Sequence, residues 1–368
     1  MSQPRSIVDL SVFPFPAKRD ERFCAPGFRV GVFSIRNGLA LAPMAGITDA
    51  PFRRLCRTQG AEYTVAEMTS AQLSLQRSQK SRSRGQRDCE ETPFVMQIVG
   101  SDAETMAAAA RFHVERGADI IDVNMGCSAP KVYKKAAGAA LLANEMQVAR
   151  ILRAVVRAVS APVTLKFRTG VTPREKNATR IARIAEDAGV KLLALHGRTR
   201  ACAFHGAAEY ETVREVKQAV TIPVLVNGDI DSPQKARAVL QHTGADGVMI
   251  GRAALGKPWL FREIVCALAN DGVVNAPTAQ EKYGLIQAHL DAIHEFYGEA
   301  VGVRVARKHM LAYARTLGIP ESADGKSWRA NMLAATDAVS QQVALVSMFQ
   351  LSERFITDLE NDHCRKVA

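Results

Sequence analysis

The sequence lacks the long apolar segments and the paired cysteines that mark membrane and secreted proteins. No run approaches the roughly 18 apolar residues that a membrane helix needs, and the N-terminal residues include Asp9 and several prolines in place of a signal-peptide core. The seven cysteines form no C-x-x-C pair and no cluster with histidine at zinc-ligand spacing. We therefore expect a cytoplasmic protein with reduced thiols, no disulfide framework and no metal site.

The sequence also lacks the G-x-G-x-x-G turn that opens many doubly wound dinucleotide-binding sheets. Between residues 39 and 270, short apolar runs alternate with helix-length amphipathic stretches, which is typical of a parallel sheet with crossover helices. Eight such runs in about 230 residues favour a (β/α)8 TIM barrel. The runs are Leu39–Leu41, Tyr63–Glu67, Phe94–Ile98, Asp119–Asn124, Val163–Phe167, Leu192–His196, Val224–Asn227 and Val248–Ile250.

Glycine and proline mark the beginnings of several runs. Four glycines stand just before a run, where a helix would end and a left-handed cap favours glycine. Three prolines open other runs, at the strand position where a missing N–H breaks no ladder hydrogen bond. These residues are Gly60, Gly117, Gly189, Gly244, Pro93, Pro162 and Pro223.

Two segments flank the predicted barrel. Residues 1–36 form a partly irregular N-terminal extension, to which we assign no function. Towards the C-terminus the apolar period becomes purely helical, and Thr278 and Glu281 have the spacing of a capping box. We therefore divide the α/β chain into the extension, a barrel at residues 37–272 and a smaller helical C-terminal domain at residues 273–368.

The charge of the chain is strongly positive and unevenly distributed. The net charge of +11 favours a polyanionic partner such as nucleic acid, although a basic enzyme without one has the same composition. Residues 271–368 hold ten Lys and Arg against twelve Asp and Glu, so the rest of the chain carries +13. Two basic clusters are either solvated faces or contacts to RNA phosphates. They are the stretch 77–87, which has no acidic residue, and Arg304, Arg307, Lys308 and Arg315 at helical spacing.

The candidate site residues are those at the carboxyl ends of the eight runs or just after them, because a TIM barrel carries its chemistry at the carboxyl ends of the strands. These positions are polar and rich in glycine, unlike the runs before them. They include Pro43, Met44, Ala45, Glu67, Gln97, Asn124, Cys127, Lys166, Arg168, His196, Arg198, Asn227, Gly228, Asp229, Gly251 and Arg252.

Several of these residues favour a flavin mononucleotide (FMN) site. The turns after the last two strands, with Arg252, can hold a phosphate through glycine N–H groups and a following helix N-terminus, or they are simply tight turns. Lys166 and His196 end neighbouring strands, and a cation near the N1–C2 edge of a flavin stabilises its anionic reduced form. The amide of Gln97 can hydrogen-bond the polar edge of the ring. Taken singly, each of these residues is more often a surface residue or a polar core residue with its hydrogen bonds satisfied.

Cys127 is the candidate acid. A free cysteine is most often a small buried apolar residue. Here, however, it follows Asn124-Met125-Gly126 in a predicted barrel loop and precedes three lysines at positions 131, 134 and 135. Because a thiol is mostly protonated at neutral pH, it suits a general acid better than a nucleophile.

Six motifs, in this order, resemble the tRNA-dihydrouridine synthase family. The segment His196–Tyr210 is most similar to the bacterial B-type members, and Arg304–His309 resembles the family's C-terminal RNA-binding helical domain. The similarity covers about residues 30–355. The six motifs are Leu41–Asp49, Asn124–Cys127, Leu165–Gly170, His196–Arg200, Val226–Ile230 and Ile250–Arg252.

The resemblance implies that NADPH reduces FMN, that hydride passes to C6 of a flipped-out uracil in tRNA, and that Cys127 protonates C5. It also implies a D-loop target, uridine 17 in tRNA numbering, and we expect a monomer. By matching motif, the FMN ligands would be Pro43, Met44, Ala45, Gln97, Lys166, Asn227, Gly228, Asp229, Gly251 and Arg252, with His196 beside them. The uracil would face Asn124, Arg168 and Arg198, and the tRNA would contact Arg304, Arg307 and Lys308.

The chain departs from the family pattern in the loop of Cys127. Ser128 follows Cys127 where the family usually has proline, and Tyr133 stands where it usually has asparagine. From the residues alone, two other classes stay open: an FMN barrel of the dihydroorotate-dehydrogenase kind acting on a free pyrimidine, and a non-catalytic RNA-binding barrel. The helical C-terminal domain and the basic front half count against the first. The intact ring of polar strand ends counts against the second.

Overall fold

The computed structural model of the chain describes residues 27–72, 74, 87, 92–269 and 276–367, with side chains as far as residue 352. The described residues fall into two compact units. The barrel unit lies within Pro14–Ala253 and Leu260–Asn275, and the helical unit lies within Ala254–Trp259 and Ala276–Ala368. The predicted domain division at residues 36 and 272 stays a prediction.

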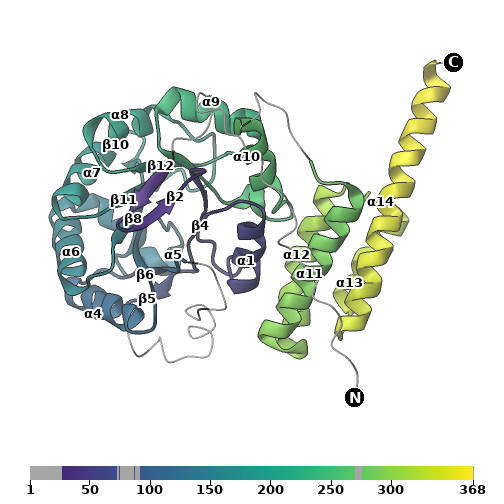
Figure 1. The fold of residues 1–368 in the computed structure, drawn as a ribbon, viewed down its shortest axis with the longest axis horizontal. Coiled ribbons are helices and arrows are strands. Elements are labelled where there is room, and N and C mark those ends of the chain that lie inside the picture. Colours follow the sequence, from purple (N-terminus) through teal and green to yellow (C-terminus); the bar gives the residue numbers. More distant parts are fainter. Residues whose placement is uncertain (1–26, 73, 75–86, 88–91, 270–275, 368) are drawn as a thin grey trace. The chain divides into compact units, whose positions relative to one another are not determined.

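The barrel unit is a closed parallel β-barrel ringed by helices (Figure 1). Its strands are β3 (Leu39–Leu41), β4 (Tyr63–Thr64), β5 (Thr69–Ser70), β6 (Val95–Val99), β7 (Ile120–Met125), β8 (Val163–Arg168), β11 (Leu192–His196), β12 (Val224–Asn227) and β13 (Gly247–Ile250). They form one sheet in the order β4-β3-β13-β12-β11-β8-β7-β6-β5. The strands β4 and β5 are two halves of one strand position, and Val65 between them bridges Val95 in parallel. The ladder therefore runs full circle, and the predicted TIM barrel is confirmed.

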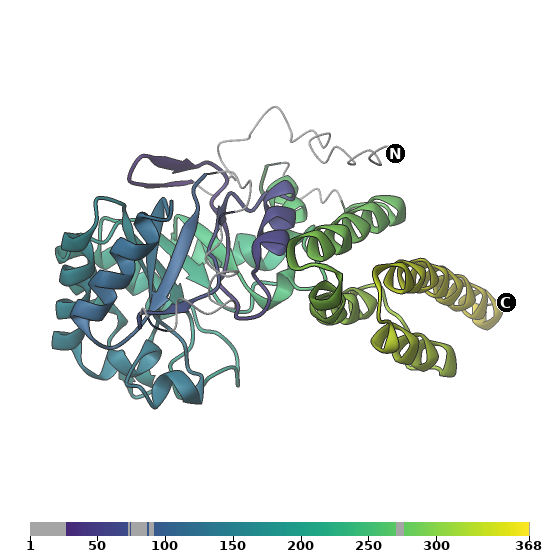
Figure 2. The same ribbon diagram turned by 90° about the horizontal axis from the view of Figure 1, so that it is seen from below.

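An antiparallel hairpin covers the amino-terminal end of the barrel (Figure 2). Its strands are β1 (Phe28–Val30) and β2 (Phe33–Ile35), and Phe28, Val30 and Ile35 are buried in the same cluster as residues of the barrel interior. At its turn Gly31 has φ +60°, and a Cβ there would lie 2.6 Å from Cγ of Pro162, which precedes β8. The sequence patterns did not predict this hairpin. It leaves the carboxyl ends of the strands as the open end of the barrel.

The barrel helices begin and end at residues suited to caps. The carboxylate of Asp49 accepts the N–H of Phe52, and Asp102 and Asn144 cap two other helices in the same way. Gly244 closes another helix at φ +65°, as predicted. The helices are α1 (Ala50–Thr58), α4 (Ala103–Val114), α6 (Glu145–Ala158), α7 (Ala178–Asp187), α8 (Glu211–Ala219), α9 (Pro233–Thr243) and α10 (Leu260–Ala269). Shorter elements at loops are α5 (Pro130–Tyr133), η2 (Gly138–Ala143), β9 (Gly170–Thr172), β10 (Glu175–Lys176) and η3 (Arg252–Ala254).

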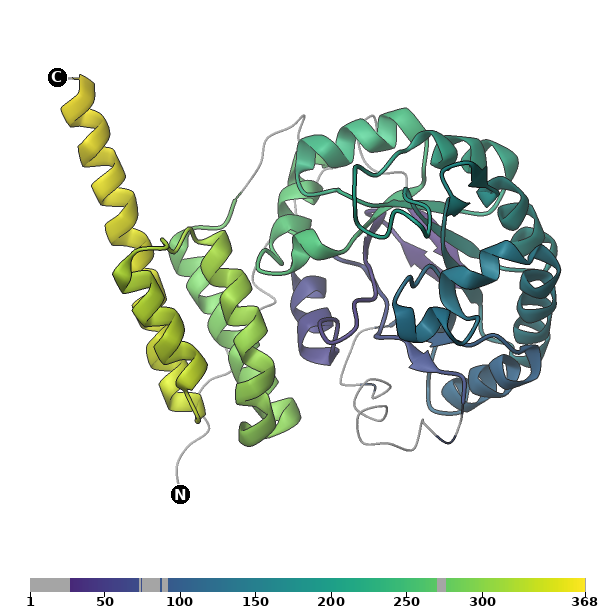
Figure 3. The same cartoon turned by 180° about the vertical axis from the view of Figure 1, so that it is seen from behind.

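The helical unit consists of helices that pack side by side (Figure 3). They are α11 (Ala279–Tyr297), α12 (Glu299–Thr316), α13 (Ala323–Ala334) and α14 (Ala338–Val367). The predicted capping box is present, because Thr278 and Glu281 exchange side-chain and backbone hydrogen bonds. Trp328 is buried and donates its Nε1–H to the carbonyl of Ala344 at 2.8 Å. Within the described ranges, no helix has both the length and the apolar character needed to cross a bilayer.

Candidate active site at the carboxyl end of the barrel

Strand register places the predicted residues at one edge of the barrel. Asn124 is paired with Lys166 across β7 and β8, and His196 is paired with both Arg168 and Asn227 across the next strands. All of these strands are parallel, so their carboxyl ends meet at the same mouth. The side chains are nevertheless at least nine-tenths buried. Their burial means that each polar group needs a partner from the protein or from a ligand.

A chain of hydrogen bonds leads from the barrel interior to Cys127. The carboxylate of Asp122 accepts from Gln97 Nε2 at 2.6 Å, and Gln97 Oε1 accepts from Asn124 Nδ2 at 2.8 Å. Asn124 Oδ1 then accepts the backbone N–H of Gly126 at 3.1 Å and that of Cys127 at 2.9 Å. The amide of Gln97, assigned from the sequence to FMN, and that of Asn124, assigned to uracil, therefore hold the loop of Cys127 in place. Only the hydrogen-bonding capacity that this chain does not use is left for ligands.

Lys166 and Asp122 are buried in the barrel interior. Burial, reinforced by the charge of Arg168, lowers the pKa of Lys166 to about 7, although the charge of Asp122 opposes this change. Burial raises the pKa of Asp122 to about 6, opposed by hydrogen bonds from Thr164 and Gln97 and by the charge of Lys166. Among the described residues, none forms a hydrogen bond or ion pair with the Lys166 ammonium group. A buried cation without such a partner fits an anionic ligand edge.

His196 is a neutral ring at the mouth. Burial, together with the positive charges of Lys166, Arg168, Arg198 and Arg252, lowers its pKa to about 2. Its Nδ1 is buried and has no partner among the described residues. A neutral imidazole has one donor and one acceptor nitrogen, so it can hydrogen-bond a ligand without adding charge.

Arg168 joins the loop of Cys127 to the loop after β11. Its Nε donates to the carbonyl of Gly126 at 2.8 Å, and its Nη1 donates to the carbonyls of Thr199 and Ala203 at 3.0 and 2.8 Å. Its guanidinium lies 5.5 Å from the ring centre of Phe204. The side chain thus fixes two walls of the mouth, and its Nη2 has no partner among the described residues.

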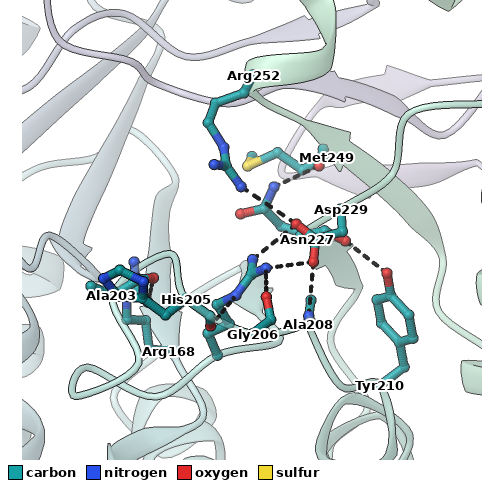
Figure 4. A network of polar contacts seen from close by, with 12 residues as sticks. Arg168, Ala203, His205, Gly206, Ala208, Tyr210, Asn227, Asp229, Met249 and Arg252 are labelled. Carbon is teal, nitrogen blue, oxygen red and sulfur yellow. Dashed lines mark hydrogen bonds and ion pairs between the residues drawn. The ribbon is translucent and has the colours of Figure 1, made fainter.

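Asp229 lies at the centre of a network of polar contacts (Figure 4). The buried Arg198 side chain forms a bidentate pair with this carboxylate. Nη1 and Nη2 donate to the two carboxylate oxygens at 2.9 and 2.6 Å, and the same guanidinium donates to the carbonyls of His205 and Gly206. Asp229 also accepts the N–H of Ala208 at 2.8 Å. The pair therefore ties the end of β12 to the loop 199–208.

The residues predicted to hold a phosphate lie at the ends of β12 and β13. Asn227 donates to the carbonyl of Met249 at 2.7 Å, and Arg252 reaches Asp229 at 3.4 Å while its side chain stays 60% exposed. Gly228 has φ +123°, and a Cβ there would lie 2.9 Å from the Cβ of Ala208. Only the short turn η3 (Arg252–Ala254) follows Gly251, where the sequence pattern predicted the start of a helix. An anion here would therefore depend on Arg252 and on backbone N–H groups.

Pro43, Met44 and Ala45 follow β3, the strand that pairs with β13. The N–H of Met44 bonds Thr48 Oγ1 at 2.9 Å, and the N–H of Gly46 bonds the carboxylate of Glu67 at 2.6 Å. The sulfur of Met44 would lie 3.8 Å from a Cβ added to Gly251. This segment is therefore held near the end of β13 by its own turn.

Three features of the site were missed in the sequence. Asp122 was detectable as a charged residue between the apolar Ile121 and Val123 of a predicted strand. Phe204 is 55% exposed, with its ring 4.6 Å from the Arg252 guanidinium and 6.4 Å from the His196 ring. The guanidinium of Arg200 stacks on Tyr133 at 3.8 Å. Phe204 and Arg252 are far apart in sequence, and so are Arg200 and Tyr133, so no local pattern signals either contact.

The predicted RNA contacts are placed unevenly. On α12, Arg304 and Arg315 are exposed, whereas Arg307 is half-buried and donates to the carbonyl of Ala335 at 2.9 Å. Lys308 is half-buried on the same helix. Of the basic stretch 77–87, all but Arg87 lies outside the described residues, and Arg87 forms an ion pair with Asp119 at 3.2 Å. The exposed pair on α12 is therefore the better candidate for phosphate contacts.

The arrangement fits a flavin on the evidence of the protein's own groups. Among the residues that the structure describes, the Lys166 ammonium has no hydrogen-bond or ion-pair partner and Nδ1 of His196 is orphaned. Together with the exposed Arg252 guanidinium, these are the groups that a ring with a polar edge and a phosphate tail would require. At the end of a neighbouring strand, the Cys127 thiol is partly exposed and forms no disulfide with any described cysteine.

Comparisons with known proteins agree on one family. The model of the family "Dihydrouridine synthase (Dus)" matches residues 40–353. "tRNA-dihydrouridine synthase B" of Pseudomonas putida is 51% identical over 326 residues, 89% of this chain and 95% of that protein. The protein of the same name from Escherichia coli K12 is 50% identical over 88% of this chain and 99% of its own length. A crystal structure of TcOYE with pHBA aligns at 11% identity and a TM-score of 0.49, over 71% of this chain and 96% of that one. That likeness is too remote to carry an argument.

Proposed function

This chain belongs to the dihydrouridine synthase (Dus) family, and we propose that it reduces a uridine of tRNA to 5,6-dihydrouridine. The observation that carries the proposal is a partly exposed thiol, Cys127, whose loop is anchored beside a buried lysine and a neutral histidine at the open end of a TIM barrel. A flavin oxidoreductase that also needs a proton donor requires these groups together.

We assign the cofactor as FMN with NADPH as the reductant. When bound, reduced FMN supplies the hydride that uracil C6 receives. Lys166 provides positive charge for the polar edge of the ring, and His196 offers a neutral hydrogen-bonding nitrogen. Arg252 and the backbone at Gly228 and Gly251 hold the phosphate. The other assigned contacts are Pro43, Met44, Ala45, Gln97, Asn227 and Asp229, of which Asp229 acts mainly by holding Arg198 and Arg252.

Cys127 donates the proton. Its thiol gives H⁺ to C5 of the uracil and is left as a thiolate. The Arg168 guanidinium lies close enough to that sulfur to interact with it electrostatically. Arg168 also binds the carbonyl of Gly126, which holds the loop in place while the proton moves. Solvent then returns a proton to the thiol for the next turnover.

Recognition of the uracil involves Asn124, Arg168 and Arg198 in this proposal. Nη2 of Arg168 has no hydrogen-bond partner in the described part of the chain, so it can donate to a uracil carbonyl oxygen. Arg198 donates through all three of its nitrogens to Asp229, His205 and Gly206, so its contribution is mainly to shape the wall of the mouth. A base reaches such a closed ring of side chains only when it is turned out of its stack.

The tRNA partner is bound in part by the helical unit. Arg304 and Arg315 are exposed on α12 and suit phosphate contacts, with Lys308 on the same helix, while Arg307 mainly holds the carbonyl of Ala335. From the similarity to proteins called tRNA-dihydrouridine synthase B, we propose a D-loop target, uridine 17. We expect the enzyme to act as a monomer in the cytoplasm, where its tRNA substrate is found.

The decisive experiment maps dihydrouridine in tRNA. The tRNA of cells that lack this protein should lose dihydrouridine at one D-loop position, and the wild-type gene should restore it. A Cys127→Ala gene should not restore it, although the variant protein is present at a normal level. Unchanged dihydrouridine at every position in the deletion strain would refute the proposed activity. Loss at a position other than 17 would refute only the target.

A further inference from the structure

The hydrogen-bond chain beneath Cys127 has a direction. A carboxylate at Asp122 can only accept, and the backbone N–H groups of Gly126 and Cys127 can only donate. Between them lie two side-chain amides, each with one oxygen and one NH2 group. The observed order is Cys127 N–H to Asn124 Oδ1, Asn124 Nδ2 to Gln97 Oε1, and Gln97 Nε2 to Asp122 Oδ2, at 2.9, 2.8 and 2.6 Å. Each donor thus meets an acceptor only if both amides face the way they do.

The anchor of this chain is itself firmly held. Asp122 is 2% exposed, and its second oxygen accepts the hydroxyl of Thr164 at 2.6 Å. That hydroxyl lies 3.3 Å from the Tyr63 hydroxyl, also inside the barrel. The strands β6, β7 and β8 place the three partners level, because Gln97 pairs with Asp122 and Asp122 pairs with Thr164 in register. Asp122, Thr164 and Gln97 are all buried, so water does not readily substitute for a partner lost among them.

We propose that Asp122 is a positioning residue for the proton donor. It fixes the orientation of the Gln97 and Asn124 amides, and through them it holds the backbone of Gly126 and Cys127 so that the thiol is presented at the mouth. Asp122 touches neither substrate nor cofactor in this scheme. The role of the thiol as acid rests on the proposed function, whereas the orientation of the amides does not.

Two substitutions of Asp122 separate orientation from charge. Asp122→Asn keeps an acceptor oxygen for Gln97, and its new NH2 group can donate to the Thr164 hydroxyl, which accepts as readily as it donates. Asp122→Leu removes the acceptor. Gln97 is then free to turn its amide over, which sets NH2 against NH2 at Asn124 and releases the two backbone N–H groups of the loop.

The direct test is hydrogen exchange of the Gly126 and Cys127 amides in the purified protein without tRNA. We expect about tenfold faster exchange of both amides in Asp122→Leu, the effect of losing one net hydrogen bond, and little change in Asp122→Asn. Gln97→Met, which breaks the chain one step later, should reproduce the faster exchange. The matched control is Asp246→Leu, since Asp246 also bonds a neighbouring strand, through the N–H of Val224 at 2.8 Å, but has no link to Cys127.

The kinetic test separates the two half-reactions. In Asp122→Leu, oxidation of the reduced flavin by tRNA should slow by roughly tenfold to a hundredfold, as expected for a misplaced acid. Reduction by NADPH does not use the thiol, so it should slow by a smaller factor than oxidation by tRNA, even though Gln97 also contacts the flavin in the proposed function. Asp122→Asn should recover most of the tRNA-dependent rate.

The outcomes distinguish this inference from the proposed function. Wild-type exchange in Asp122→Leu, or equally fast exchange in the Asp246 control, would overturn the positioning role. So would an Asp122→Asn variant that is as slow with tRNA as the leucine variant. If exchange changes as expected but no variant, nor the wild type, reduces tRNA, the positioning stands and the proposed function fails.

Discussion

Replacing Arg198 by methionine tests whether this arginine maintains the mouth of the barrel. The Arg198 side chain is 3% exposed and forms a bidentate pair with Asp229, which is 31% exposed. Loss of one partner from a fully buried ion pair costs about 3–5 kcal/mol. Asp229 keeps the N–H of Ala208 and some contact with water, so its charge is not left wholly unpaired. The carbonyls of His205 and Gly206 belong to exposed residues and can turn to water. We therefore expect a loss near the lower end, about 3 kcal/mol.

The assay is thermal unfolding of the protein without flavin or tRNA, because a bound ligand would add its own stabilisation. A loss of about 3 kcal/mol lowers Tm by roughly 6–12 °C for a domain of this size class. Arg198→Lys should recover less than half, since an ammonium cannot form the bidentate fork. The stability lost in the double variant Arg198→Met with Asp229→Asn should be about 1–2 kcal/mol smaller than the sum of the losses in the two single variants. A cost below about 1 kcal/mol, or strict additivity, would refute the pairing argument.

The same pair predicts the acid limb of the stability profile. Burial tends to raise the pKa of Asp229, but the hydrogen bonds from Arg198 and Ala208 and the charges of Arg198 and Arg252 outweigh it and lower the pKa. A carboxyl whose pKa is lower in the folded state contributes stability above its unfolded pKa of about 3.9, and that contribution is lost as pH falls through the folded value. Wild type should thus lose stability below about pH 4 more steeply than Arg198→Met.

Three further predictions concern the flavin, the acid and the RNA. FMN affinity should fall as pH rises through about 7, where Lys166 loses its charge, and Lys166→Met should bind FMN weakly at every pH. The same dependence of FMN affinity on pH in both proteins would contradict this. Cys127→Ala should keep NADPH-driven flavin reduction but slow flavin oxidation by tRNA on the order of 10²-fold, and a wild-type rate would make the thiol a structural residue. Reversing Arg304 and Arg315 to glutamate should flatten the salt dependence of tRNA binding, whereas reversing Arg329 of α13 should not; equal slopes in a binding series would remove α12 from the interface.

The barrel could be predicted from the sequence because its signals are local. The runs at β3, β11 and β12 match the observed strands residue for residue, and Gly244 and Thr278 begin or end helices as expected. Parallel strands buried on both faces show up as short apolar runs, and glycine and capping residues mark their borders. The ring of site positions followed directly, since the fold itself brings strand ends together.

The pairing of the polar groups could not be predicted. Of the run Tyr63–Glu67 only Tyr63–Thr64 is a strand, and the next strand, β5, begins beyond the run at Thr69. The carboxylate of Glu67 instead binds the N–H of Gly46. Arg198, predicted to face a ligand, is held by Asp229 from another strand. Such partners are chosen by strand register and by closure of the barrel, and their separation in the chain leaves no periodic trace. The residues that line a mouth were therefore foreseeable, but their division between ligand contacts and support was not.

The two buried arginines that hold residues 199–206 have a consequence for how a nucleotide enters. Arg168 and Arg198 bond four carbonyls of that loop, so the wall that presents Phe204 is set before any substrate arrives. A wall held in this way adapts little to nucleotides of different shape. The RNA therefore has to deform for a base to enter the mouth. A base leaves its stack most readily in a loop that is already bent and poorly stacked. In the proposed function, the mouth of the barrel would therefore favour uridines in easily deformed segments of a tRNA.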